Sequence, residues 1–222
     1  MEANVNTQKV SGEKPSLFGM ITSPSLQFER MRTNAPVWGA FFLLTLLGGI
    51  VYMAIAYASL DTPELAKALK EDPTGTAKYF IIGGGFVTGL ITTVIMFFIT
   101  AALYKVIMMF MGNDTTYKKL LSITVYSSVI TYLGLLVNAV LVIVLGGDGT
   151  ARFTSLGPLF EKGTVAFGIG NSIEIFAIWG LFVTWLGLHI TAGLSKKQAT
   201  ILVVIFFVIS LAFSAFTGLG AK

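Results

Sequence analysis

The sequence predicts an all-α, polytopic membrane protein: a bundle of five transmembrane helices preceded by an N-terminal interfacial helix. Of its 222 residues 55% are apolar and 12% charged, and the mean hydropathy is +0.81. The apolar residues gather in five runs, each close to or longer than the roughly 20 residues that cross a bilayer core. The ten-residue alternation typical of barrel strands is missing. This composition excludes a soluble globular domain.

The N-terminal part divides at about residue 22. Residues 1–22 are mostly polar, and we expect a disordered cytoplasmic tail there, without the basic-then-apolar layout of a secretory signal. Residues 23–219 are expected to form one membrane domain. Ser23-Pro24 is typical of a helix start, and charged and apolar residues alternate up to about Thr33. We interpret this segment as a helix lying at the membrane surface, ended by Asn34-Ala35-Pro36.

The first span is predicted at 37–60, with Trp38 and Tyr57 as interfacial anchors near its ends. A short extramembrane helix is expected at 63–71, since Asp61-Thr62-Pro63 is a helix-start signal and Asp72-Pro73 stops the helix.

The second span is predicted at about 83–111. The whole apolar run from residue 79 would reach roughly 50 Å as a helix, so it must tilt or protrude. Gly85 and Gly89 form a small-xxx-small pair at which another helix can approach closely.

The third span is predicted at 120–145, after Tyr117-Lys118-Lys119. A glycine-rich, nearly uncharged loop follows at 146–171, and its apolar segment 154–160 is suited to dip toward the membrane. The last two spans, at 172–194 and 199–219, form a helical hairpin because only Ser195-Lys196-Lys197 joins the two runs.

The charge distribution predicts a cytoplasmic N-terminus and a C-terminus outside. With this orientation, nine of the 15 Lys and Arg residues lie on the cytoplasmic side: Lys9, Lys14, Arg30, Arg32, Lys105, Lys118, Lys119, Lys196 and Lys197. Basic residues in short loops favour the cytoplasmic side.

No motif for catalysis or cofactor binding is found. One histidine and no cysteine exclude a His/Cys zinc site and disfavour a histidine-dependent triad. The glycine-containing segment 167–172 is not followed by the Lys-Ser/Thr pair of a phosphate-binding loop. The segment 146–149 has a single carboxylate, which supplies too few oxygen ligands for a calcium ion. No basic block with interleaved aromatic residues indicates nucleic-acid binding. We expect no enzymatic activity, cofactor or metal.

Three polar residues within the predicted spans are candidate functional groups: Glu174, His189 and Asn138. Intramembrane charges are often functional. However, Glu174 lies two residues into its span, where a plain interfacial or helix N-terminal carboxylate is the simpler interpretation. His189 lies roughly 22 Å further along the same helix, which excludes a relay between them. For His189 an interfacial role is preferred over a ligand, and Asn138 is expected to bond to a neighbouring helix.

Small residues on the fourth span predict a close-packed face and a central position in the bundle. They are Gly180, Thr184, Gly187 and Thr191. The aromatic residues of this span are equally consistent with packing, lipid contact or a groove; they are Phe176, Trp179, Phe182 and Trp185.

Three segments resemble the bacterial branch of the Yip family of membrane proteins: SPSLQFERMRTNAPVWG (23–39), YKKLLSITVYSSVI (117–130) and IWGLFVTWLGLHITAGLSKKQA (178–199). The most specific match is Leu-Ser-Lys followed by alanine at 194–199. The resemblance covers about 23–219 and implies five spans, a cytoplasmic N-terminus and no known active site. Eukaryotic members are implied in vesicle traffic through small GTPases, and bacterial relatives resemble accessory membrane proteins, some beside ABC-type efflux systems.

The preferred hypothesis is therefore a non-enzymatic scaffold or adaptor in the bacterial cell membrane. Its expected partners are the lipid bilayer and another membrane protein, such as an ABC exporter component, or a second copy of itself. The alternative is a small transporter or channel with Glu174, Asn138 and His189 lining a path. An intramembrane enzyme is the least favoured.

Overall fold

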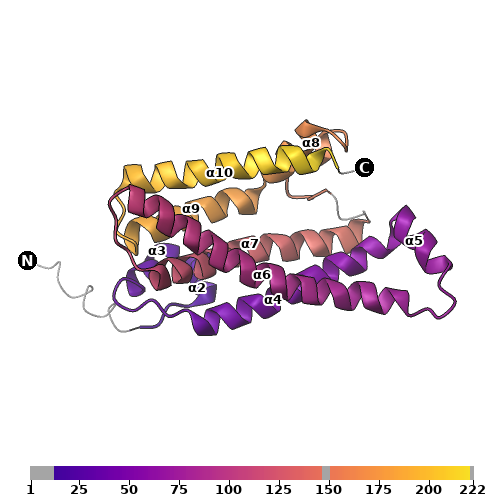
Figure 1. Ribbon diagram of the computed structural model, residues 1–222, viewed down its shortest axis with the longest axis horizontal. Coiled ribbons are helices and arrows are strands. Elements are labelled where there is room, and N and C mark those ends of the chain that lie inside the picture. Colours follow the sequence, from indigo (N-terminus) through magenta and orange to yellow (C-terminus); the bar gives the residue numbers. More distant parts are fainter. Residues whose placement is uncertain (1–12, 147–150, 221–222) are drawn as a thin grey trace, which may run out of the picture. The chain divides into compact units, whose positions relative to one another are not determined.

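The computed structural model describes residues 13–146 and 151–220, which are mostly helical (Figure 1). The helices are α2 (Leu17–Thr22), α3 (Pro24–Arg30), α4 (Trp38–Ala58), α5 (Pro63–Lys70), α6 (Ala77–Phe110), α7 (Tyr117–Leu145), α8 (Val165–Ser172), α9 (Ile175–Ile190) and α10 (Lys196–Gly218). Two single 3₁₀ turns are added, η1 (Ser59–Asp61) and η2 (Gly157–Leu159). The predicted all-α class is confirmed.

Within the described residues, four helices are long and apolar enough to cross a membrane: α4 extended through η1, α6, α7 and α10. This confirms a multi-pass membrane architecture. The helix α6, with 34 residues, spans about 51 Å and exceeds the bilayer core, as its sequence predicts. The helix α9 is apolar but has only 16 residues, about 24 Å, so its length alone does not establish a fifth span.

The helix α9 is shorter than the predicted span 172–194 at both ends. At its start, Ile173 leaves the helical region and residues 173–175 pair with the preceding loop. At its end, Gly193 has a φ of +76°, and the Leu194 N–H donates to the Leu188 carbonyl. A left-handed glycine with such a bond is a common helix C-terminus.

The contacts divide the chain into two compact units. Unit 1 comprises Met1–Leu43, Ile95–Thr131 and Trp179–Phe207, and unit 2 comprises Leu44–Val94, Tyr132–Ile178 and Val208–Lys222. Each of the five longest helices contributes one segment to each unit.

The N-terminal helices belong to the core of unit 1. Met20 of α2 and Phe28 of α3 have no exposed surface. The Ser16 hydroxyl accepts a hydrogen bond from the Gly19 N–H and caps α2, and the Ser16 N–H donates to Gln27 Oε1 over 2.9 Å. The expected disordered tail is therefore shorter than 1–22, because residues 17–22 form a packed helix; residues 1–12 lie outside the described part of the chain.

Side-chain hydroxyls fasten this N-terminal segment to the rest of unit 1. Thr191 Oγ1 donates to the Phe28 carbonyl over 2.8 Å, and Ser122 Oγ donates to the Pro36 carbonyl over 2.7 Å. Lys119 Nζ donates to the Arg32 carbonyl. These bonds join carbonyl groups at the end of α3 and in the break before α4 to α7 and to the residue after α9. Carbonyl groups at a helix end lack a full set of helical partners.

In unit 2, glycines allow α4 and α6 to approach closely. A Cβ atom on Gly89 would lie 2.6 Å from the Gly48 carbonyl oxygen, and one on Gly85 would lie 2.6 Å from the Ala56 Cβ. A buried hydrogen bond of 2.6 Å joins the hydroxyls of Thr93 on α6 and Tyr132 on α7. The small-xxx-small pair thus lies at a helix–helix contact.

The turn before α6 is organised by Asp72. Its carboxylate accepts hydrogen bonds from the Thr74 N–H and hydroxyl and from the Ala77 N–H, at 2.6–2.9 Å. These contacts satisfy an otherwise unpaired N–H group at the start of the longest helix.

Candidate functional site

The loop after α7 folds back and pairs with the residues that precede α9. Ser155 and Glu174 form an isolated antiparallel bridge, with the Leu156 N–H donating to the Ile173 carbonyl. This pairing buries Glu174, of which only 4% is exposed. The interpretation of Glu174 as a carboxylate in reach of interfacial water is therefore corrected, because the folded-back loop covers it.

The Glu174 carboxylate receives hydrogen bonds from three side chains. Oε1 accepts from Asn138 Nδ2 at 2.8 Å and from Thr154 Oγ1 at 2.7 Å. Oε2 accepts from Arg152 Nη1 at 3.2 Å, which forms an ion pair. An isolated buried carboxylate is very costly, whereas one with a cation and two further donors is compensated. We call Asn138, Arg152, Thr154 and Glu174 the polar cluster.

Asn138 links the polar cluster to α7. Its side chain is buried, Nδ2 also approaches the Gly134 carbonyl at 2.9 Å, and Oδ1 accepts from the Thr154 N–H at 3.2 Å. The expected bond to a neighbouring helix is thus a set of bonds to the folded-back loop and to the residue before α9.

Asn171 and Thr164 hold the rest of the loop. Asn171 Oδ1 accepts from the Arg152 N–H at 3.1 Å and from the Ser155 hydroxyl at 3.1 Å. The Thr164 hydroxyl accepts from the Phe167 N–H and caps α8. Neither α8 nor the role of Arg152 was predicted from the sequence; the available signal for α8 was Thr164 before the apolar stretch Val-Ala-Phe.

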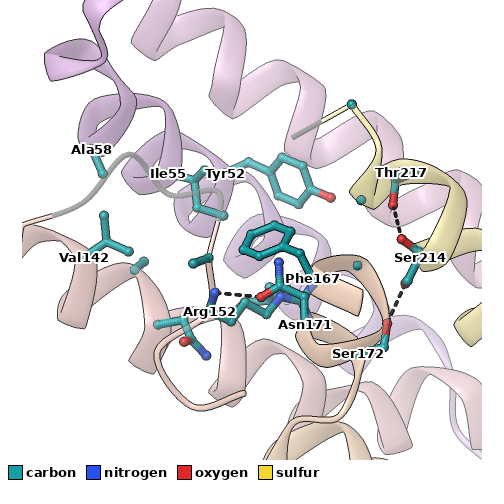
Figure 2. Close-up of a pocket in the computed structure, with 17 residues that line it drawn as sticks. Tyr52, Ile55, Ala58, Val142, Arg152, Phe167, Asn171, Ser172, Ser214 and Thr217 are labelled. Carbon is teal, nitrogen blue, oxygen red and sulfur yellow. Dashed lines mark hydrogen bonds between the residues drawn. The ribbon is translucent and has the colours of Figure 1, made fainter. Parts of the chain in front are cut away.

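A cavity of about 620 Å³ lies beside the polar cluster within unit 2. Its walls come from the last turns of α4, α7 and α10 and from α8 (Figure 2). Apolar side chains supply much of the lining, including Ile55, Val142 and Phe167, while Asn138 and Arg152 reach it from the polar cluster. This volume falls within the range of about 300–1,000 Å³ of small-molecule sites.

The wall between α8 and α10 is built by direct backbone contact. A Cβ atom on Gly168 would overlap the Ser214 carbonyl oxygen, and one on Gly218 would lie 2.6 Å from the Gly168 Cα. The hydroxyls of Ser172 and Ser214 are hydrogen-bonded across the same wall, and the Thr217 hydroxyl donates to the Ser214 carbonyl (Figure 2). No larger side chain fits at these glycines without moving backbone.

His189 belongs to unit 1 and is not part of the polar cluster. Its Nδ1 lies 2.7 Å from the Leu194 carbonyl oxygen, so Nδ1 carries the proton and donates. The ring centroid lies 5.4 Å from that of Trp185. The arrangement places His189 at the C-terminus of α9, where its N–H group satisfies a carbonyl beyond the helix end.

The predicted packing residues of α9 have different surroundings within unit 1. A Cβ atom on Gly187 would lie 2.7 Å from Ile123 Cγ2 and 2.8 Å from the Phe28 ring, whereas one on Gly180 would meet only the Thr131 hydroxyl at 3.8 Å. Thr184 is half-buried. Close packing is therefore centred on Gly187.

Comparisons with known proteins cover nearly the whole chain. The family model described as "Yip1 domain" matches residues 18–217. The protein called "Membrane protein YknW" from Bacillus subtilis (strain 168) is 36% identical over 226 residues, which is 99% of this chain and 97% of that protein. No solved structure matches. The chain therefore belongs to the Yip1-domain family and is a multi-pass membrane protein.

Proposed function

We propose that the protein is a non-enzymatic membrane scaffold or adaptor. The observation that carries this proposal is the use of the polar cluster: Glu174 and Asn138 direct their bonds to each other and to the folded-back loop. Such an arrangement supports a structural role, because it holds a loop in place instead of presenting an acid or base to a substrate. Membership of the Yip1-domain family agrees with it.

In its most concrete form, the proposed role is that of an accessory component beside an ABC-type exporter in the bacterial cell membrane, in envelope stress or toxin resistance. The charge distribution supports docking of a partner through unit 1. Unit 1 carries nine Lys and Arg against four Asp and Glu, a net charge of +5, whereas unit 2 carries six against seven, a net charge of −1. A net positive charge on unit 1 favours a partner with an acidic cytoplasmic surface.

We further propose five spans, with the N-terminus in the cytoplasm and the C-terminus outside. The basic unit 1 then lies at the cytoplasmic side, in agreement with the positive-inside rule. The 16 residues of α9 are about 24 Å long, whereas the bilayer core is about 30 Å thick. The residues on either side of α9 would therefore complete the crossing.

The cavity favours a second candidate function, a small transporter or channel. Asn138 and Arg152 line it, so a solute could meet polar groups there. Of the three residues expected to line a path, His189 lies in unit 1 and is bonded to the Leu194 carbonyl. Only Glu174 and Asn138 lie together beside the cavity. A Glu174→Gln variant that reaches the membrane at normal levels and loses transport in liposomes would favour this function over the scaffold.

The scaffold proposal is tested by tagged purification of the full chain in nanodiscs, followed by quantitative mass spectrometry. A stoichiometric membrane partner, in particular an exporter permease, is the expected result. Lys118→Gln with Lys197→Gln, both at exposed positions of unit 1, should lower recovery of this partner. The control, Lys67→Gln with Lys70→Gln in α5, removes the same charge from unit 2. A chain that purifies without a partner contradicts the proposal.

A further inference from the structure

The cavity of unit 2 has the composition of a site for an amphiphile. Its apolar lining comes from membrane-spanning helices and from α8, including Ile55 of α4, Val142 of α7 and Phe167 of α8. Figure 2 shows the rings of Phe167 and Tyr52 in the middle of the view. Within a membrane, such a surface is complementary to an alkyl chain, because hydrocarbon makes the same dispersion contacts as the neighbouring helices.

The polar end of the cavity carries one cation with donors to spare. A guanidinium has five N–H donors in a planar fork that matches carboxylate and phosphate oxygens. Among the described residues, the Arg152 side chain donates a hydrogen bond from Nη1 to the Glu174 carboxylate. The side chain is 44% exposed. The backbone of Arg152 is fixed separately, by the bond from its N–H group to Asn171 Oδ1. The guanidinium is therefore held at the cavity and can bind a second anionic group.

We propose that this cavity binds an anionic amphiphile, an alkyl chain that carries a phosphate or carboxylate head. The chain lies against the apolar wall and the head contacts the Arg152 guanidinium. The Glu174 carboxylate competes with the head for Arg152, so the site favours a ligand whose chain contributes much of the affinity. This inference is independent of the scaffold function, since a scaffold and a transporter could both hold a lipid there.

The test uses the full chain in phosphatidylcholine nanodiscs that contain one photoactivatable probe at a time. The probes are diazirine derivatives of phosphatidylglycerol, phosphatidylcholine and palmitate, and the labelled peptides are identified by mass spectrometry. We expect an anionic probe to label Phe167 and Val142 about tenfold more than the phosphatidylcholine probe does. A single hydrogen bond between charged groups accounts for a difference in affinity of about this size. Labelling by phosphatidylglycerol alone assigns a phospholipid, and labelling by palmitate alone assigns a free fatty acid.

Variants that fill the cavity provide the steric control. Ala139→Phe should reduce labelling of Phe167 by about tenfold, because Ala139 lines the cavity and an added ring occupies the chain's volume. Its neighbour Val140 is 51% exposed, so Val140→Phe adds the same ring outside the cavity and should leave labelling unchanged. Ala58→Phe fills the cavity from α4 and serves if the buried Ala139 site does not tolerate a ring.

Neutralisation of both charges tests the head group. Arg152→Gln combined with Glu174→Gln leaves no unpaired charge and should reduce labelling by the anionic probe to the phosphatidylcholine level. Equal labelling by all three probes in the unaltered protein, or labelling confined to outward residues such as Val140, overturns the proposal. So does a cavity-filling variant that folds and labels normally.

Discussion

Glu174 shows how one buried charge can order a loop in a membrane protein. Its carboxylate accepts hydrogen bonds from α7 through Asn138 and from the folded-back loop through Thr154 and Arg152. The donors come from two places, α7 and the loop, so the carboxylate has all its partners only when the loop is folded back against α7. The polar cluster therefore couples burial of Glu174 to closure of the loop over it.

We predict that Asn138→Leu destabilises the protein by about 1–3 kcal/mol. The variant leaves the buried Glu174 carboxylate with one donor fewer and the Thr154 N–H without its acceptor. Thermal unfolding in detergent, followed by size-exclusion chromatography, measures the loss. Val140→Leu, two residues further along α7 and exposed, is the control and should unfold like the unaltered protein. Equal midpoints for the two variants would contradict the assigned role of Asn138.

Asp72 gives a pH-dependent prediction outside the spans. Hydrogen bonds from the Thr74 hydroxyl, and then from the Ala77 and Thr74 N–H groups, lower the pKa of Asp72 from 3.8 to about 2. A lowered pKa in the folded state means that the ionised form stabilises the turn. That contribution is complete above pH 4 and is lost as the pH falls toward 2.

The measurement is hydrogen exchange of the Thr74 and Ala77 amides as a function of pH, corrected for intrinsic exchange rates. Protection should fall between about pH 4 and 2 in the unaltered protein. In Asp72→Asn it should be weaker throughout and independent of pH in this window. A pH profile that survives this substitution would assign the titration to another group.

At the scale of elements, α4 and α6 illustrate why glycines on one helix are not equivalent. A Cβ atom on Gly84 would meet no neighbouring atom within 4 Å, whereas one on Gly89 would press against the backbone of Gly48 and Gly49. We predict that Gly84→Ala stabilises α6 by up to about 1 kcal/mol through helix propensity. Gly89→Ala should instead destabilise by about 1–3 kcal/mol, because backbone must move.

Both glycine variants add one methyl group to the same helix, so each is the other's control. Equilibrium unfolding in mixed micelles should give changes in the free energy of unfolding of opposite sign. Changes of the same sign would show that α4 and α6 do not meet at Gly89.

The helices could be predicted from the sequence far better than the site. Long apolar runs placed α4, α6, α7 and α10, and the Pro63 signal placed α5 correctly, because local composition determines where a membrane helix forms. The polar cluster depends on Arg152 and Glu174, which are 22 residues apart and meet only when the loop folds back. Periodicity contains no information about such a contact. For the same reason α9 was predicted too long and α8 was missed.

For the whole molecule, the five-span orientation predicts the reactivity of single cysteines. The chain has no native cysteine, so each introduced thiol is unique. With five spans, Lys70→Cys and Gly220→Cys should react with a membrane-impermeant maleimide in intact cells, and Lys197→Cys only after permeabilisation. If α9 does not cross, position 197 becomes accessible from outside and position 220 becomes protected. A reactive position 70 in both cases confirms that the reagent reaches the outer face.

The wall that α10 contributes to the cavity has a consequence for biosynthesis. Ser214 and Gly218, which touch α8 through backbone contacts, leave the ribosome after α4, α7 and α8, the other helices that line the cavity. Residues 196–207 of α10 belong to unit 1 and residues 208–218 belong to unit 2. Because α10 is one continuous helix, neither unit is complete before it is made, and the lateral release of α10 from the translocon becomes the step that closes the compartment beside the polar cluster.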